Sequence, residues 1–367
     1  MPAYERNYGI DALRILSMIM IPVLHVLGHG GILASAAKLS LNYSVAWLLE
    51  IACFGAINLF GMISGYVGYG KKIKYANIIV LTLQVLFYKI IITALFAVFV
   101  PGSVGIKGML TSLLPLYSNT YWYFSAYFGM FFFIPFLNYL LENLSKQRLQ
   151  ILIFSILLCF CLITTLFHQD FAAVKFGYSS LWLASLYIMG GYIKKYDVGK
   201  NIKTGKLFSG YLIFTGISFL SRIGIELVTK LVFKRPIDGG YLIQYVSPTI
   251  VLGSVFLFLY FTRLSFNNNI AKRIVSFFTP ATFGVYLIHD FPLVRQYFIL
   301  HKFEFLLNYN PIIMMLAVIA AALGIFIVCA LIDKLRILLF KLLKIKAGME
   351  ALERRVKSGL IKLYAKF

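Results

Sequence analysis

The first apolar stretch of the chain, Ile10–Leu33, contains ionisable side chains whose types and spacing could do chemistry. Arg14 stands near its start, and His25 follows about three helical turns later, on nearly the same face of a helix. An ionisable side chain inside an apolar run is costly in hydrocarbon, so it marks a candidate functional site. A neutral imidazole can accept a proton from a hydroxyl group near neutral pH, which makes His25 a candidate general base. The alternative is a buried histidine that only hydrogen-bonds a neighbouring helix.

His29 stands one helical turn after His25, a spacing that two metal ligands on a helix can share. The helix of a zinc protease carries glutamate directly after its first histidine, and Val26 occupies that position here. We therefore predict no metal site and no bound cofactor.

A second candidate site lies where the second apolar stretch ends. Ser64 and Gly65 belong to a run of small residues there, and such residues let helices approach closely and leave backbone N–H groups accessible. Three lysines follow at once, and they could hold phosphates presented from the cytosol. They are Lys71, Lys72 and Lys74. Taken by itself, this motif is explained by small-residue packing followed by the positive charges typical of a cytoplasmic loop. Because Arg14 lies at the same membrane face, we nevertheless predict a site for a phosphate-rich nucleotide carrier.

A third group, Tyr286 to Asp290, ends a late apolar stretch and contains His289. Counting ~1.5 Å per residue from the cytoplasmic ends places His25 and His289 at comparable depths, roughly 18–22 Å into the membrane. Arg222, in another apolar stretch, falls near the same level. We predict a shared polar cavity; the alternative places His289 beside Asp290 at the outer interface, in water.

Three single residues are further candidates. Glu50 lies in the outer part of the second stretch, where it could orient a histidine or touch a sugar. Trp122 stands between two tyrosines and fits either an interfacial aromatic belt or a surface on which a sugar stacks. Lys89 lies in the middle of a span, where it either snorkels or fills the same cavity.

The composition indicates a membrane protein. Hydrophobic residues make up 60% of the 367 residues and charged residues only 13%. A soluble chain of this kind would expose large apolar patches and aggregate. The net charge of +22 would suggest nucleic acid as a partner of a soluble protein, but the distribution of charge matters more here. We expect a lipid bilayer and no nucleic acid. The four cysteines lie in apolar runs without zinc or redox spacing, which favours packing.

Runs of about 20 apolar residues predict an all-α fold, a polytopic transmembrane helix bundle of about ten spans. The predicted spans are Ile10–Leu33, Val45–Val67, Ile78–Val100, Tyr121–Leu141, Leu149–Phe167, Ser179–Ile193, Leu207–Ile225, Tyr245–Phe261, Ile274–His289 and Pro311–Ile332. We expect the first to be retained as a span, because no signal-peptide cleavage site stands out.

The positions of lysine and arginine predict that both termini face the cytoplasm. Residues 1–332 form one predicted transmembrane domain, and residues 333–367 form a tail in which basic and apolar residues alternate. Such a tail is typical of an amphipathic helix on the anionic inner leaflet. A docking site for a partner protein is the alternative.

These stretches together resemble the membrane acyltransferase-3 family, in particular its surface-polysaccharide O-acetyltransferase branch. The family's opening helix, where an arginine precedes the catalytic histidine, is similar to IDALRILSMIMIPVLHV. Its Ser-Gly motif and following basic motif resemble FGMISGYVGYGKKIK, its fourth-helix segment resembles YWYFSAYFGMFFFIPFLN, and its Tyr-Leu-x-His motif resembles FGVYLIHDFPL. The family's basic motif usually contains arginines. Lysines stand here, so a bidentate grip on phosphate is not implied.

The resemblance implies an O-acyltransferase of the cell membrane that takes an acyl group, most often acetyl, from cytosolic acyl-CoA. The acceptor would be a hydroxyl of a cell-surface or lipid-linked glycan. His25 would act as general base or transient acyl acceptor, Arg14 would position His25 or the carrier, and His289 would orient the acceptor or assist proton transfer. The predicted substrate-binding residues are Glu50, Ser64, Gly65, Lys71, Lys72, Lys74, Trp122, Arg222 and Tyr286.

Two other functions remain open from the sequence. One is a transporter or flippase of a lipid-linked saccharide, although the internal repeats frequent in transporters are not evident. The other is a scaffold that acts through its basic tail. N-acylation of an amino sugar and a homodimer are further alternatives.

Overall fold

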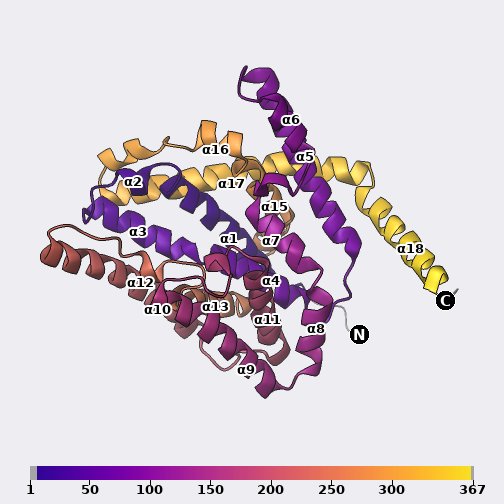
Figure 1. Cartoon of the computed structure of the whole chain (residues 1–367), viewed down its shortest axis with the longest axis horizontal. Coiled ribbons are helices and arrows are strands. Elements are labelled where there is room, and N and C mark those ends of the chain that lie inside the picture. Colours follow the sequence, from indigo (N-terminus) through magenta and orange to yellow (C-terminus); the bar gives the residue numbers. More distant parts are fainter. Residues whose placement is uncertain (1–5, 365–367) are drawn as a thin grey trace.

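The computed structural model describes residues 6–364, and within that range it consists of helices and loops without a strand (Figure 1). The α-helices are α1 (Tyr8–Leu27), α2 (Ile32–Ser35), α3 (Leu41–Phe54), α4 (Ala56–Gly68), α5 (Tyr75–Phe99), α6 (Ile106–Ser112), α7 (Trp122–Phe131), α8 (Ile134–Asn143), α9 (Lys146–Ile156), α10 (Thr164–Phe167), α11 (Ser180–Tyr196), α12 (Thr204–Phe233), α13 (Pro248–Thr262), α14 (Asn269–Phe278), α15 (Thr282–His289), α16 (Pro292–Phe298), α17 (Pro311–Leu342) and α18 (Ile345–Tyr364). A π-helical segment, η2 (Leu157–Ile163), joins α9 to α10. Short 3₁₀ turns are η1 (Tyr117–Asn119), η3 (Lys175–Gly177), η4 (Gly240–Leu242), η5 (Thr279–Ala281) and η6 (Glu304–Asn308). The predicted all-α class is confirmed.

Six helical segments in residues 6–364 are long and apolar enough to cross a bilayer, and the number is up to eight if each of two bent pairs is one span. Helix α11 has 17 residues and α13 has 15, fewer than the about 20 that a span needs. The helix bundle is therefore confirmed, whereas the number of about ten spans is not. The cytoplasmic orientation of the termini remains a prediction.

Two prolines restart helices at the bends. The axes of α7 and α8 differ by 58°, and Pro135 stands in the first turn of α8. The segment Asn269–His289 meets α16 at 74°, where Pro292 begins α16. Proline lacks the N–H that a helix interior needs, yet its fixed φ suits a first turn. The second bend leaves His289 at the end of α15.

Helix α1 ends earlier than the sequence predicts. The predicted span runs to Leu33, but the helix stops at Leu27, with Gly28 as its C-cap. Gly31 has a φ of 92°, which side chains with a Cβ rarely adopt, and a Cβ there would lie 2.3 Å from the carboxylate of Glu304. As a result His25 occupies the last turn of α1.

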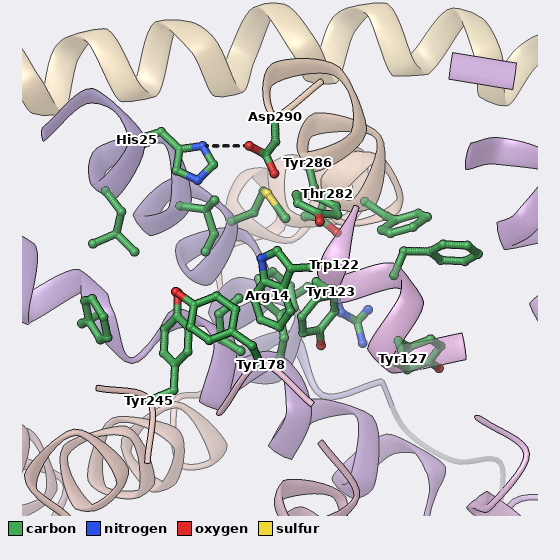
Figure 2. Close-up of a pocket in the computed structure, with 18 of the residues that line it drawn as sticks. Arg14, His25, Trp122, Tyr123, Tyr127, Tyr178, Tyr245, Thr282, Tyr286 and Asp290 are labelled. Atoms are coloured by element: carbon green, nitrogen blue, oxygen red, sulfur yellow. Dashed lines mark ion pairs between the residues drawn. The ribbon is translucent and has the colours of Figure 1, made fainter. Parts of the chain in front are cut away.

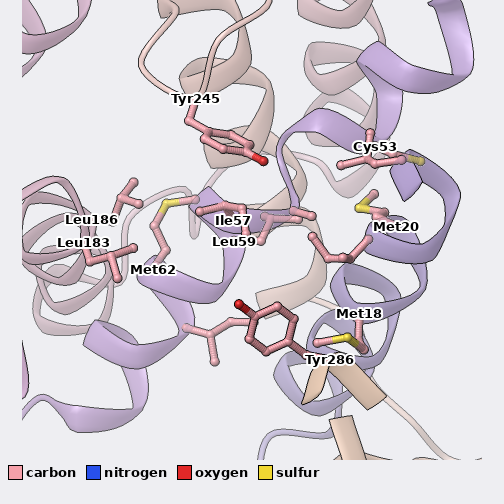
Figure 3. Close-up of a cluster of buried hydrophobic side chains, with 14 of the residues drawn as sticks. Met18, Met20, Cys53, Ile57, Leu59, Met62, Leu183, Leu186, Tyr245 and Tyr286 are labelled. Carbon is pink, nitrogen blue, oxygen red and sulfur yellow. The ribbon is translucent and has the colours of Figure 1, made fainter. Parts of the chain in front are cut away.

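Helices α4 and α11 pack backbone to backbone. A Cβ on Gly65 would lie 1.9 Å from the carbonyl oxygen of Tyr187, and one on Gly190 would lie 2.0 Å from that of Met62. Figure 3 shows Met62 of α4 beside Leu183 and Leu186 of α11. Small residues are what permits such an approach.

A buried polar network centred on Asp333 joins α17 to its neighbours. Arg336 donates to Asp333 at 2.7 Å, and the hydroxyl of Tyr88 on α5 donates to the same carboxylate at 2.7 Å. Gly284 of α15 faces this carboxylate, because a Cβ there would lie 2.1 Å from Asp333. The network holds α5, α15 and α17 together, and α17 runs on past residue 332 to Leu342.

The predicted tail, residues 333–367, does not form one helix: residues 333–342 continue α17 and Ile345–Tyr364 form α18, and residues 365–367 lie outside the described ones. Figure 1 shows α18 leaving the end of α17 at an angle, and α18 packs against α5. Glu353 accepts a hydrogen bond from the backbone N–H of Ala76 at 3.0 Å, and Glu350 pairs with Lys74 at 3.3 Å. The hydrogen bonds from Lys357 and from Ala76 lower the pKa of Glu353. Acidic residues of the tail therefore bind the first turn of α5.

The tight α4–α11 contact leads to a test of the fold. We expect Gly190→Ala to destabilise the protein by about 1–3 kcal/mol, because the new methyl group overlaps the carbonyl of Met62. The matched control is Gly216→Ala in α12, where a Cβ would meet nothing within 4 Å and helix propensity favours alanine. Thermal unfolding in detergent should show a lower Tm for the first variant only. Equal Tm values would contradict the packing described.

Candidate functional site

A cavity of about 550 Å³ lies among α1, α3, α4, α7 and α15 (Figure 2). Six residues that the sequence predicts for the site line it. They are Arg14, His25, Glu50, Ser64, Trp122 and Tyr286. The structure thus brings together residues from five helices that are far apart in the sequence.

Three histidine rings meet at one end of this cavity. The ring centroid of His25 lies 5.0 Å from that of His289 and 5.0 Å from that of His29. His289 is 1% exposed and sits behind His25 rather than in the cavity wall. Its Nδ1 lies 2.6 Å from the carbonyl oxygen of Val285, and a carbonyl only accepts, so Nδ1 carries the proton. In the neutral ring this leaves Nε2 with a free lone pair.

Asp290 is the carboxylate nearest to His25. Its Oδ1 lies 3.7 Å from Nδ1 of His25, which is too long for a hydrogen bond, and 3.1 Å from Arg295. Figure 2 shows His25 and Asp290 facing each other across the upper part of the cavity. From the sequence, Asp290 was expected only as a solvated neighbour of His289, and Arg295 was not predicted for the site. A signal was present, since Arg295 stands about one helical turn beyond the bend after Asp290.

Aromatic rings form another part of the wall, around Trp122. The indole lies 4.5 Å from the ring of Tyr178, which lies 4.9 Å from that of Tyr245. Tyr178 follows η3, in which Gly177 has a φ of 105° and a Cβ would approach Tyr245 to 2.4 Å. The backbone of Tyr245 is held by Asn58, which donates to its carbonyl at 2.8 Å. Sequence reasoning missed both tyrosines, because they lie in loops whose folding has no periodic signal.

A second cavity, of about 330 Å³, continues toward the start of α5. It shares Arg14, Ser64 and Tyr127 with the first cavity. The three predicted lysines line it; they are Lys71, Lys72 and Lys74. Arg14 stands at the junction, 3.6 Å from Asp11, with its side chain 29% exposed. The two hollows together lead from the lysines to the histidines.

Two further candidates lie elsewhere: Gly65, a predicted substrate-binding residue, and Lys89, which was predicted either to snorkel or to fill the same cavity. Gly65 packs against the backbone of Tyr187 and lines neither cavity, which agrees with the packing alternative. Lys89 also lies apart, with its ammonium donating to the carbonyl of Leu114 at 2.7 Å. The depth of Lys89 in its span and the small size of Gly65 did not show whether each residue lines a cavity or packs against another part of the chain.

Arg222 is likewise outside the cavity, so the predicted grouping of Arg222 with His25 and His289 is corrected. Its guanidinium pairs with Glu226 at 3.1 Å and with Asp238 at 2.9 Å, and it stacks on Trp47 at 3.3 Å. Equal depth in a bundle does not fix the face to which a side chain points, and this face of α12 turns toward α3.

One group of described residues could hold a metal ion. His25, His29 and Asp290 offer ligand atoms that all lie within 4.8 Å of one another. Ligands about 2.0–2.1 Å from a tetrahedral zinc ion lie only ~3.3 Å apart, and Arg295 already pairs with Asp290. The arrangement is wider than a zinc site, and the absence of a metal remains a prediction.

A family model described as an acyltransferase domain matches residues 7–334. The match spans α1 through most of α17 and so contains both cavities. No curated protein and no solved structure matches the chain.

The placement of Arg222 gives a prediction about stability. We expect Arg222→Met to destabilise the protein by about 3–5 kcal/mol, because it leaves the buried Glu226 carboxylate without its cation. The double variant Arg222→Met/Glu226→Gln should recover much of that loss. The measurement is thermal unfolding of both variants in detergent. An unchanged Tm for Arg222→Met would show that the pair does not support the fold.

Proposed function

Since the chain belongs to the membrane acyltransferase-3 family and is therefore an acyltransferase, we propose that it transfers an acyl group from cytosolic acyl-CoA to a hydroxyl of a cell-surface or lipid-linked glycan. Acetyl is the acyl group proposed, with acetyl-CoA as donor. The observation that carries the proposal is a pair of neighbouring cavities that share lining residues, one lined by the three lysines and the other by His25.

The chemistry of the donor fits the lysine end. Coenzyme A has phosphates at one end and its thioester at the other. Ammonium groups bind phosphates as point charges, so the lysines would hold the nucleotide part. Arg14, at the junction of the cavities, would attract the remaining phosphate charge or guide the carrier toward His25. The thioester would then enter the larger cavity.

The chemistry of transfer needs a base near the acceptor hydroxyl. His25 would take the hydroxyl proton while the oxygen attacks the thioester carbonyl carbon. The C–S bond breaks, and the proton passes to the departing thiolate to give free CoA and the acylated sugar. A transient acyl group on His25 is the other route. His289 and Asp290 would position the imidazole, because both lie beside its ring.

The proposed setting is the cell membrane, with several passes and both termini in the cytoplasm. The donor would enter from the cytosol and the glycan from the opposite side. The basic residues of α18 would rest on the anionic leaflet, with a homodimer as a possible assembly.

The first functional prediction concerns His25. We expect His25→Ala to lower acyl transfer by about 10²–10⁴-fold, because the general base is lost. Mass spectrometry of surface glycans should show loss of the acyl mass while membrane abundance of the protein is unchanged. The matched control is His301→Ala, at an exposed histidine that pairs with Glu304. Wild-type glycan acylation in the His25 variant would remove this residue from the mechanism.

The second functional prediction concerns the donor. Lys71→Gln/Lys72→Gln should raise the KM for acetyl-CoA severalfold with little change in kcat, because phosphate binding weakens in the ground state and transition state alike. The rate of thiol release in proteoliposomes measures both constants. Lys203→Gln/Lys206→Gln changes the charge equally at exposed sites outside both cavities. The same KM shift in both double variants would mean a general charge effect and no donor site.

A further inference from the structure

Glu50 is a buried carboxylate that the mechanism above does not use. It lines the larger cavity, is 8% exposed, and its Oε2 atom has no hydrogen-bond partner among the described residues. A buried polar group without a hydrogen-bond partner is costly, so a protein keeps one where a ligand can satisfy it. Arg222 on α12 is paired with Glu226 and Asp238 instead of with Glu50.

The surroundings of Glu50 are aromatic. Trp122, Tyr178, Tyr245 and Phe54 line the same cavity, and the planes of Trp122 and Tyr245 differ by only 23°. Figure 2 shows the Trp122, Tyr178 and Tyr245 side chains grouped below the His25–Asp290 pair. Flat apolar walls with one carboxylate match a ring that has C–H faces and hydroxyls at its edge.

The aromatic wall is held in place from behind. Asn58, fully buried, donates to the carbonyl of Tyr245 and accepts at 3.0 Å from the indole N–H of Trp182. Phe54 stacks on Tyr245 at 4.8 Å. A binding surface whose supporting residues are fixed loses less entropy when its ligand arrives.

We infer that Glu50, Trp122, Tyr178 and Tyr245 form the acceptor subsite, and that it binds an uncharged pyranose ring. The inference rests on the proposed function for the identity of the site as an acceptor site. Sugar hydroxyls hydrogen-bond to the Glu50 carboxyl group, and the ring stacks on the aromatic side chains. A sugar that carries its own carboxylate, such as a uronic acid, is rejected because none of these four residues is a cation that could pair with the buried charge.

The test uses the purified full chain and matched short glycosides. Isothermal titration calorimetry measures binding of hexyl glucoside, galactoside and mannoside, and of hexyl glucuronide, without acyl-CoA. We expect at least one neutral glycoside to bind and the glucuronide to bind at least tenfold more weakly. Glu50→Gln should weaken binding of that neutral glycoside about tenfold, because the amide replaces one of the two carboxyl oxygens.

Variants elsewhere separate the subsite from general damage. Glu142→Gln makes the same chemical change at an exposed position outside both cavities and should bind like the wild type. Trp122→Leu should lose affinity that Trp122→Phe largely keeps, because phenylalanine retains an aromatic face. Binding is compared only between variants whose Tm in detergent matches that of the wild type. If Trp122→Leu unfolds, Glu50→Gln still tests the subsite, because it hardly changes the side-chain volume.

The outcomes for the subsite and for the function are distinct. If no neutral glycoside binds, if the glucuronide binds equally well, or if Glu50→Gln leaves every affinity unchanged, the subsite is overturned whatever the enzyme does. Thiol release from acetyl-CoA in the presence of a bound glycoside tests the transfer itself. Glycoside binding that depends on Glu50 without any thiol release supports the subsite and counts against the proposed function.

Discussion

The constraint that organises this molecule is the cost of burying ionisable groups in an apolar bundle. Most buried charges are met by a partner. Asp333 is paired with Arg336 and accepts from Tyr88, while Glu226 is paired with Arg222. Each pair lies within one helix, and a tyrosine hydroxyl from another helix donates to each carboxylate: Tyr88 to Asp333 and Tyr43 to Glu226. Both pairs lie outside the two cavities. We assign these pairs a role in stability, because a buried charge that already has a partner needs no ligand to satisfy it.

Among the described residues, nine buried side-chain polar atoms lack a hydrogen-bond partner, and four of them belong to residues at the larger cavity or directly behind it. These four are Nδ1 of His25, Nε2 of His289, Oε2 of Glu50 and the hydroxyl of Tyr286. His25 and Glu50 line the larger cavity, and His289 stacks behind His25. Polar atoms without a hydrogen-bond partner therefore lie in the wall of the cavity, where a substrate can reach them, or on His289 directly behind His25. The cavity is thus more than a packing defect, because an empty packing defect would be lined by apolar groups.

Sequence reasoning could place Arg14 and His25 in one hollow because a single helix fixes their relative face. It could also group His289 with His25 by depth, and the two rings are neighbours. The same depth argument failed for Arg222, since depth says nothing about the direction of a side chain around a helix axis. Loop residues such as Tyr178 and Tyr245 could not be found, because hydrogen bonds and a positive-φ glycine, not periodicity, bring them to the site.

Span prediction had a related weakness. Hydropathy detects runs of apolar residues, but it does not show where a helix bends or stops. Helix α1 ends at Gly28, and the chain turns at Gly31, before the apolar run ends at Leu33. His25 therefore lies at the end of a helix. The prediction for the tail rested on its alternating basic and apolar residues, whereas two of its few acidic residues, Glu350 and Glu353, bond to the start of α5. The composition of the tail predicts an amphipathic helix, whereas individual residues determine which helix it packs against.

The distribution of charge along the joined cavities also bears on how two substrates could share them. The lysines and Arg14 lie toward one end, and the carboxylates of Glu50 and Asp290 line the other part. Under the proposed function, the cations of the first region would hold the phosphates of an anionic carrier while its uncharged thioester end advances. A neutral sugar would be selected by shape and hydrogen bonding instead. The two substrates would then meet at His25 from opposite directions without competing for the same wall.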